Sequence, residues 1–395
     1  MNLSPTPDQE TFRAECRRWL EQNLPGGYGR GLPLLFDDLA EEVAFLRGWQ
    51  AALAEARFVG VAWPAAYGGR GAGPLHHYIV QEELARAGAP ELVGRIGVNL
   101  IGPTILAHGT TEQQQRWLPS ILPAHQLFCQ LFSEPDAGSD LASLSTSATP
   151  TNGGWLLNGQ KVWTSYAQFA DWGLCLARSH PAAPKHQGIT AFVIDMHTDG
   201  VEIRPLRQIT GEADFNEVFL NDVFVADDQV LGPPGEGWRV SQSTLGVERG
   251  TNPRQLVIHI QLLDELLRAA AETGQNADLR IRQSLARAYT EVRLFQLQNW
   301  RVLSRLTGGH GGGPEAATAK LFWSEMSQRL HETALEVLGP AALLWRDDPH
   351  NPGGGRWQRS WLYYRAASIF AGTSEIQRNI IGERTLGLPR ESRKE

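Results

Sequence analysis

Apolar positions repeat with a helical period along residues 1–125. Phe12 and Leu20 fall on one face of the first predicted helix, and the same period recurs along residues 39–53. A further helix is predicted after Pro74, because proline suits the first turn of a helix. This part of the chain is therefore predicted to be a helical domain.

The pattern changes to that of β-strands along residues 127–231. Apolar runs predict strands at 173–177, 189–194 and 216–225. The segment 155–163 holds two short apolar runs around Asn158 and Gly159, a pair typical of tight hairpin turns, so a hairpin is predicted there. We expect this middle part to form an antiparallel β-domain.

Helical spacing returns after Gly237 and predicts three long helices, one of which opens at Pro314 and ends at Gly339. The chain is thus predicted to be an α+β protein of three domains. These are an N-terminal helical domain at 1–125, a β-domain at 126–232 and a C-terminal helical domain at 233–395.

Composition and charge argue against several classes of protein. Of 395 residues, 42% are hydrophobic and 20% are charged, which is typical of a globular protein. The formal net charge is −7 and no basic run occurs, which argues against nucleic acid as a partner. No apolar segment approaches the roughly 18 residues of a membrane-spanning helix, and the first residues do not resemble a secretion signal. We expect a cytoplasmic protein that does not contact membranes.

The three cysteines, Cys16, Cys129 and Cys175, are far apart in the sequence. Neither C-x-x-C nor H-E-x-x-H occurs, so a disulfide scaffold or a zinc site is not expected. We predict no metal site and expect the cysteines to be small core residues.

The segment 369–388 near the end of the chain is predicted to be a capped helix. Gly372 frees the backbone where Thr373 or Ser374 can act as the N-cap, so the first amides of the helix suit an anionic group. The alternative is an ordinary helix that packs on its neighbours. Its buried stripe is predicted to consist of Ile376, Ile380, Ile381, Leu386 and Leu388.

A turn rich in small residues follows an apolar strand within 130–141, where Pro135, Gly138 and Ser139 carry little side-chain bulk. Such a turn exposes amides and hydroxyls to the close approach of a large ligand, although a plain surface turn has the same composition.

These segments closely resemble motifs of the acyl-CoA dehydrogenase family. The family signature G-T-S-E/Q-I-Q is present at 372–377, the motif E-P-x-A-G-S-D at 134–140, and an aromatic with hydroxyls at 163–165. The resemblance extends over nearly the whole chain. It implies the same three domains, the last a four-helix bundle, and an FAD-dependent enzyme of fatty acid metabolism and β-oxidation.

The resemblance implies site residues one by one. The implied flavin contacts are Gln130, Phe132, Ser133, Trp163, Thr164, Ser165, Thr373 and Glu375. An aromatic beside hydroxyls can cover a flavin ring and hydrogen-bond its polar edge, although tryptophan is more often a core residue. The implied substrate contacts are Ser139, which contacts the CoA part, with Arg249, Ala371 and Gly372.

The catalytic base is absent from its most common position in the family, because that position holds Ala371, whose methyl group accepts no proton. Isovaleryl- and long-chain-type enzymes carry the base in the first helix of the C-terminal domain, in an E-R pair. The sequence resembles them at Glu248 and Arg249, although exposed neighbouring charges are common. We therefore predict Glu248 as the base and Arg249 as its support.

The reaction implied is α,β-desaturation of an acyl-CoA. The thioester carbonyl is polarised by a flavin hydroxyl and the backbone N–H of Ala371, Glu248 removes the α-proton, and a hydride passes to flavin N5. The electrons then pass to an electron-transfer flavoprotein. A flavin oxidase or monooxygenase on the same fold is the alternative.

One family motif, R-x-x-F-G, is missing, because Ala270 and Thr273 stand at its arginine and phenylalanine positions. In the family this arginine reaches the flavin pyrophosphate of a neighbouring subunit, and Arg280 and Arg282 are candidate substitutes. A homotetramer and an α2β2 heterotetramer, in which this chain is a half-site subunit, therefore both remain open.

Overall fold

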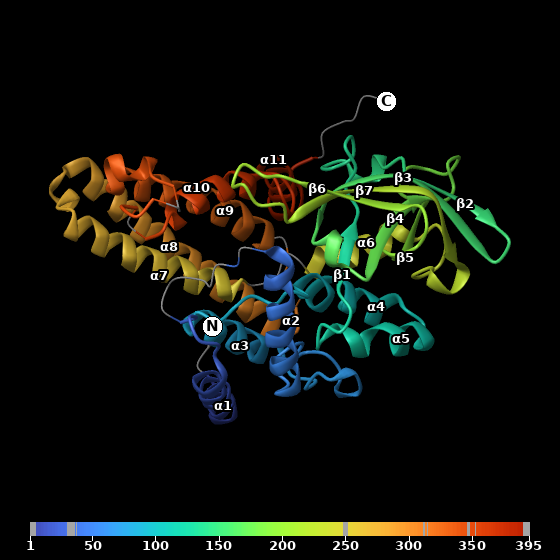
Figure 1. Ribbon diagram of the computed structural model, residues 1–395, viewed down its shortest axis with the longest axis horizontal. Helices are drawn as coiled ribbons and strands as arrows, with labels where there is room; N and C mark the ends of the chain where they lie inside the picture. Colours follow the sequence, from blue (N-terminus) through green and yellow to red (C-terminus); the bar gives the residue numbers. More distant parts are fainter. Residues whose placement is uncertain are drawn as a thin grey trace. The chain divides into compact units, whose positions relative to one another are not determined.

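The computed structural model describes residues 5–29, 36, 38–247, 252–310, 313, 315–345, 348–351 and 353–389. The chain forms two compact units (Figure 1). The first, here called the sheet unit, comprises Leu35–Ala72 and Pro90–Glu248. The second, the bundle unit, comprises Met1–Leu34, Gly73–Ala89 and Arg249–Glu395.

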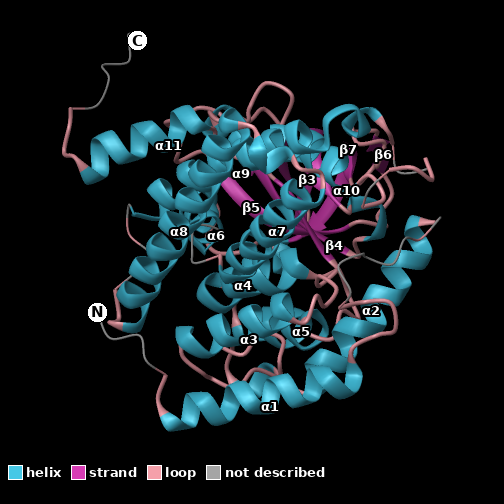
Figure 2. Cartoon of the chain, turned by 90° about the vertical axis from the view of Figure 1, so that its left-hand side faces the viewer, coloured by secondary structure: helices cyan, strands magenta, loops and turns pink. Residues whose placement is uncertain are grey.

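The sheet unit is built on seven strands, drawn in magenta in Figure 2. They are β1 (Phe128–Leu131), β2 (Ser147–Thr151), β3 (Gly154–Ser165), β4 (Trp172–Arg178), β5 (Ile189–Asp195), β6 (Val201–Leu206) and β7 (Phe215–Ala226). The order is β1-β4-β2-β3-β7-β6, and β5 pairs with β4. Most pairs are antiparallel as predicted, whereas β4 pairs in parallel with β1 and, at one register position, with β2.

The hairpin predicted around Asn158 and Gly159 is wrong, because both residues lie inside the single strand β3. Strand β7 pairs along β3 on both sides of them, with a bulge between Leu157 and Gly159. The side chain of Asn158 donates to Asp222 on β7 at 2.8 Å. The true hairpin joins β2 to β3, and the same Asn-Gly signal stands in its turn at 152–153.

Helices complete the sheet unit. They are α2 (Leu39–Glu55), α4 (Gly102–His108), α5 (Thr111–Ile121) and α6 (Gly237–Val247), with short turns η1 (Ala65–Tyr67), η2 (Gly97–Ile101), η3 (Leu141–Ser143), η4 (Ala167–Phe169) and η5 (Asp227–Gln229). The predicted helix at 39–53 is confirmed as α2. Strands β1, β4 and β5 supply buried Leu131, Cys175 and Phe192 to the core, so the sheet is held by apolar burial.

The bundle unit consists of helices. They are α1 (Pro7–Asn23), α3 (Pro74–Arg86), α7 (Pro253–Glu272), α8 (Leu279–Thr307), α9 (Glu315–Leu338), α10 (Arg356–Tyr364) and α11 (Ser374–Ile380), with η6 (Gln275–Ala277), η7 (Gly339–Leu343), η8 (Arg365–Ser368) and η9 (Ile381–Thr385). Figure 1 shows the three long helices α7, α8 and α9 side by side. Leu263, Phe295 and Leu330, one from each, meet in a common apolar core. No described helix is long and apolar enough to cross a membrane.

The buried stripe predicted for the last helix is wrong at its C-terminal end. Leu386 and Leu388 are 66% and 57% exposed, whereas the buried residues of α11 are Ser374 and Gln377. Helix α11 passes into a π-helical turn at Ile381–Thr385, and the wider turn shifts the phase of the following side chains. Of the two predicted N-cap candidates, Thr373 is the N-cap and Ser374 is the first residue of the helix, since the Thr373 hydroxyl accepts the N–H of Ile376 at 3.2 Å.

Candidate active site

Trp163 combines a left-handed backbone with an exposed aromatic side chain. It lies at a register shift near the end of β3 with φ +60°, and its side chain is 61% exposed. A left-handed conformation at a non-glycine residue costs about 1–3 kcal/mol, and such strain is concentrated at ligand sites. An exposed tryptophan held in this way is therefore a strong candidate for a ligand contact.

The two sheet-unit motifs lie side by side. The backbone N–H of Val162 donates to the carbonyl of Ser133 at 2.9 Å, and the Lys161 ammonium donates to the carbonyl of Phe132 at 3.2 Å. The structure therefore brings together the predicted contacts of 130–134 and those of 163–165. We call these residues the first cluster.

A buried ion pair holds the first cluster. The Lys161 ammonium lies 2.8 Å from the carboxylate of Glu134, and also donates to the carbonyl of Leu176 at 2.7 Å. The same carboxylate accepts the backbone N–H groups of Ser145 and Thr146 at 2.6 and 3.0 Å. Burial alone would raise the pKa of Glu134, but the Lys161 charge and these hydrogen bonds outweigh it and lower the pKa to about 2.

Thr164 offers a direct test of whether a flavin fits this cluster. The residue is 1% exposed, and among the described residues its hydroxyl has no hydrogen-bond partner. A buried polar atom without a partner is costly, so a ligand with a polar edge would stabilise it. The isoalloxazine ring of FAD has an apolar face for Trp163 and polar edge atoms for Thr164, so these residues fit it.

The other predicted contacts of the first cluster differ in exposure. Gln130, Ser133 and Ser165 are partly exposed, and Ser139 is exposed on its turn. The ring of Phe132, in contrast, is buried with 4% exposure. Its backbone is buried as well, and its carbonyl accepts the Lys161 ammonium at 3.2 Å.

In the bundle unit, the predicted residues Ala371 and Gly372 form a left-handed turn. Their φ angles are +53° and +87°, and that of Ala371 is strained. Two side chains hold their carbonyl groups. The Lys320 ammonium donates to Gly372 at 2.7 Å, and the Gln377 amide donates to Ala371 at 3.0 Å.

Helix α11 follows directly after this turn, and we call the turn and the helix start the second cluster. Thr373 caps the helix, while Glu375 is exposed and pairs with Arg378 at 3.5 Å. Within the described residues, the buried Ser374 hydroxyl and the Gln377 carbonyl oxygen have no partner. The second cluster thus offers polar atoms that a ligand can satisfy.

The predicted base Glu248 and its neighbour Arg249 lie outside the described residues. Helix α6, which ends at Val247, is tied to α4 by two polar contacts. The Thr244 and Thr104 hydroxyls lie 2.9 Å apart, and His108 bonds Ser243 at 2.7 Å. Desolvation, together with the Arg239 charge, lowers the pKa of His108, so this imidazole is neutral near pH 7.

Sequence reasoning missed Lys320 and Gln377 as site residues. The sequence signal for Lys320 is that a lysine stands beside the apolar stripe of its helix, to which Ala319 and Phe322 belong. For Gln377 the signal is its place in the family signature, three residues after Ser374.

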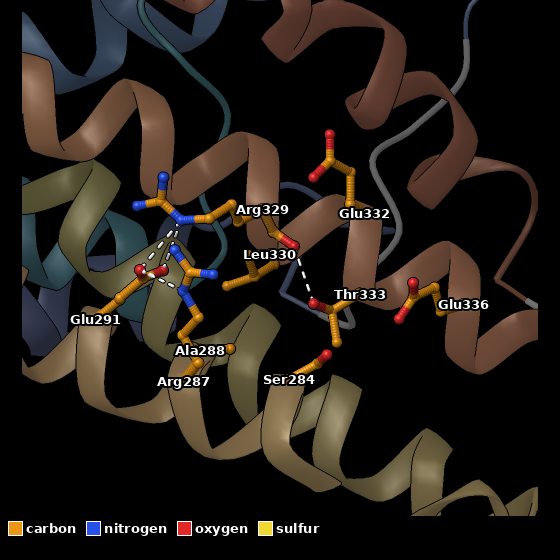
Figure 3. Close-up of a pocket in the computed structure, with 9 residues that line it drawn as sticks. All are labelled: Ser284, Arg287, Ala288, Glu291, Arg329, Leu330, Glu332, Thr333 and Glu336. Carbon is orange, nitrogen blue, oxygen red and sulfur yellow. Dashed lines mark hydrogen bonds and ion pairs between the residues drawn. The ribbon is translucent and has the colours of Figure 1, made fainter. Parts of the chain in front are cut away.

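A pocket of about 150 Å³ between α8 and α9 contains none of the predicted site residues. Figure 3 shows that two of its arginines, Arg287 and Arg329, reach the same carboxylate, that of Glu291. Arg287 and Arg329 each bond Glu291 at 3.1 Å. We assign no function to it.

Comparison with known families gives matches along most of the chain. The models of the acyl-CoA dehydrogenase N-terminal, middle and C-terminal domains match residues 6–124, 129–223 and 235–386. The chain belongs to the acyl-CoA dehydrogenase family. Members of this family are flavoprotein oxidoreductases, so the chain is an enzyme whose cofactor is FAD, as the sequence predicted. The fold class inferred from the resemblance is likewise confirmed.

Individual acyl-CoA dehydrogenases resemble the chain over its length. The enzyme IpdE1 of Mycobacterium tuberculosis is 41% identical over 392 residues, which cover 98% of this chain and 99% of IpdE1. The structure of the Tcur3481-Tcur3483 steroid ACAD matches with a TM-score of 0.85 and 27% identity, covering 99% of this chain and 100% of that one. The ChsE4-ChsE5 complex of M. tuberculosis matches with a TM-score of 0.82 and 30% identity, covering 99% and 100%.

Proposed function

We propose that the protein desaturates an acyl-CoA thioester between its α and β carbons. The observation that carries this proposal is the first cluster, where strained, exposed Trp163 stands beside the unpartnered hydroxyl of Thr164. FAD, when bound, supplies the hydride acceptor for the β-hydrogen. Trp163 covers the ring, while Thr164 and Ser165 hydrogen-bond its polar edge.

The remaining predicted contacts complete the binding of cofactor and substrate. Gln130, Phe132 and Ser133 offer further contacts from the first cluster. Thr373 and Glu375 contribute from the start of α11. Ser139 is proposed to contact the CoA part of the substrate, on an exposed turn that is tied down by the bond of Asp140 to Lys185 at 2.5 Å.

Proton removal is assigned to Glu248. Ala371 carries only a methyl group, so it cannot act as the base, but its backbone N–H remains available to polarise the thioester carbonyl. Polarisation makes the α-proton acidic enough for a carboxylate to remove. Arg249 supports the site, and Gly372 lets the backbone pass close to the thioester.

The substrate class proposed is a branched or polycyclic acyl-CoA. A methyl group at position 371 takes less space than the carboxylate side chain common there, which leaves room for a bulky acyl group. The Tcur3481-Tcur3483 protein is described as a steroid ACAD, which supports the same class of substrate. A straight short chain would fill such a site poorly.

The assembly proposed is an α2β2 heterotetramer that passes electrons to an electron-transfer flavoprotein. Ala270, which stands at the arginine position of the missing family motif, is fully buried in α7. Thr273, at the phenylalanine position, donates its hydroxyl to the carbonyl of Ala269 at 2.8 Å. Arg280 pairs with Glu336 at 3.5 Å and remains largely exposed. The ChsE4-ChsE5 relative is a complex of two different chains, which supports a partner chain here.

The test is an anaerobic scan of flavin bleaching with a panel of acyl-CoAs, performed with the chain alone and with candidate partner chains. We expect bleaching with bulky acyl-CoAs and slow reoxidation in air. Failure to retain FAD under any of these conditions contradicts the proposal, and rapid reoxidation indicates an oxidase instead. FAD counted per chain distinguishes the assemblies, since a one-to-one homotetramer contradicts the heterotetramer.

A further inference from the structure

Lys320 reaches from α9 to the backbone that precedes α11. Its ammonium donates to the carbonyl of Ala367 at 2.9 Å and to that of Gly372 at 2.7 Å. It also lies 5.9 Å from the centre of the Phe370 ring. One cation thus ties both ends of the segment that contains Ala371.

Gln377 reaches back to the same turn from within α11. Its side-chain N–H groups donate to the carbonyls of Ala371 and Gly372 at 3.0 and 3.4 Å. A Cβ atom on Gly372 would lie 2.6 Å from this amide nitrogen, so only glycine leaves room for the contact. The residue is fully buried, which fixes the direction of its amide.

These bonds determine where the N–H groups of the turn point. Peptide bonds here are trans and planar, so each N–H is directed away from the carbonyl of its own peptide group. With both carbonyls held by Gln377 and Lys320, the N–H groups of Gly372 and Thr373 point away from those side chains. Within the described residues, no hydrogen bond satisfies the N–H groups of Ala371, Gly372 and Thr373.

We propose that Lys320 is a positioning residue for the thioester site. Resting on the proposed function, this inference adds how the segment that carries the Ala371 N–H is held rigid, since Lys320 bonds the Ala367 and Gly372 carbonyls on either side of it. A glycine-containing turn can flip its peptide groups at low cost, and the two tied carbonyls prevent that flip.

The experiment measures polarisation directly. The probe is cinnamoyl-CoA, whose absorption band moves to longer wavelength when its thioester carbonyl is polarised, bound to the FAD-loaded protein with its partner chain if FAD retention requires one. We expect the parent to shift the band, Lys320→Met to lose at least half of the shift, and Lys320→Arg to keep most of it. The rate of substrate-dependent flavin reduction should fall by ~10²-fold in Lys320→Met.

Gln328→Met is the matched control, because Gln328 lies on the same helix and makes the same kind of contact. Its amide donates to the Tyr364 and Arg365 carbonyls at 3.0 and 3.4 Å and to the Ser368 hydroxyl at 3.1 Å, all of them outside the 371–372 turn. It should keep the band shift even if its stability falls. A second readout, hydrogen exchange of peptide 369–377 in the FAD-free chain, should be faster only in Lys320→Met.

The outcomes separate the two proposals. A parent protein that binds the probe without a band shift contradicts the proposed function. A parent shift that Lys320→Met retains in full contradicts the role of Lys320 alone, as does unchanged exchange in the 369–377 peptide. Loss of the shift to the same extent in Gln328→Met would show a general loosening of the bundle unit and likewise overturn the inference.

Discussion

The ammonium of Lys161 and the carboxylate of Glu134 lie 2.8 Å apart, and both side chains are buried. Lys161 belongs to β3, two residues before Trp163, and Glu134 opens the turn that carries the second motif of the sheet unit. The pair therefore fixes the distance between two segments that are proposed to share one ligand. Removing these two charges from water costs free energy, so we expect the ion pair to fix the geometry of the site more than it stabilises the fold.

Lys161→Met should destabilise the protein by about 3–5 kcal/mol, because it leaves the Glu134 carboxylate buried without its cation. The double variant Lys161→Met, Glu134→Gln should regain a large part of that stability, since no charge is left buried. FAD affinity should remain low in both variants because the tie between the two segments is lost. Urea unfolding and FAD titration measure the two effects separately.

Gln50→Met is the control for this experiment. Gln50 is fully buried in the same unit and bonds the carbonyls of Ile121 and Leu122 at 3.2 and 3.0 Å. It should lose stability without a specific loss of FAD affinity. If the double variant recovered both stability and FAD affinity, the positioning role of the Lys161 pair would be refuted.

Thr164→Val tests the unpartnered hydroxyl. In the FAD-free chain the change should be neutral or stabilising, because it removes a buried polar atom that has no partner among the described residues. With FAD it should cost one hydrogen bond, about 0.5–1.5 kcal/mol, or roughly 2- to 13-fold in affinity. Thermal unfolding without FAD and titration with FAD provide the measurements.

Trp117→Phe is its control, since the Trp117 indole N–H on α5 is also buried without a partner in the described part of the chain. It should leave FAD affinity unchanged. Equal losses of affinity in Trp117→Phe and Thr164→Val would contradict a direct contact between Thr164 and the cofactor.

Two buried histidines make the bundle unit sensitive to acid. His259 accepts a hydrogen bond from the Ser327 hydroxyl at 2.7 Å, and the His331 ring stacks on Tyr364 at 4.7 Å. Desolvation lowers the pKa of His259 to about 4 and that of His331 to about 3. Each ring is thus neutral in the fold at pH values where the unfolded chain, with a pKa near 6.5, protonates it.

The unfolded state binds more protons below pH 6.5, so the free energy of unfolding should fall as the pH drops from about 6.5 toward the folded values. Each histidine contributes a slope of up to about 1.4 kcal/mol per pH unit. His331→Phe, which keeps the stack on Tyr364, should make the slope between pH 6 and pH 4.5 shallower by about that amount. Urea unfolding across this range is the measurement, and an unchanged slope would show that His331 does not carry the effect.

The sequence was sufficient to predict the helices because their apolar periods are long and regular, as in α2, and several strands because they are continuous apolar runs, as in β4. It failed at Asn158, where a local turn signal lost to long-range pairing with β7. Strand β2 carries mostly exposed, mixed side chains without a clear period, so no pattern predicted it. Strand β6 was missed although Val201 and Ile203 alternate with exposed Glu202 and Arg204, because this run is short and contains Pro205. The end of the last helix also escaped prediction, because a π-turn changes the period that a helical stripe assumes.

The motifs in the sequence were sufficient to predict the residues of the candidate site, but not the contacts that hold those residues in place. Trp163 and Thr164 follow from the family resemblance, but the left-handed bulge and the missing hydroxyl partner are properties of the folded backbone. The contacts of Lys320 join positions more than 40 residues apart, and side-chain spacing along one helix does not reveal them.

The central claim is that Glu248 is the catalytic base, and Glu248→Gln tests it most directly. Glutamine keeps the volume but accepts no proton, and loss of a positioned base typically slows a reaction ~10²–10⁴-fold. Glu236→Gln, at an exposed acid that pairs with Arg239, serves as the control and should react at the parent rate. Anaerobic stopped-flow bleaching of the bound flavin should show this loss with FAD content unchanged. A Glu248→Gln protein that bleaches at the parent rate would contradict the assignment.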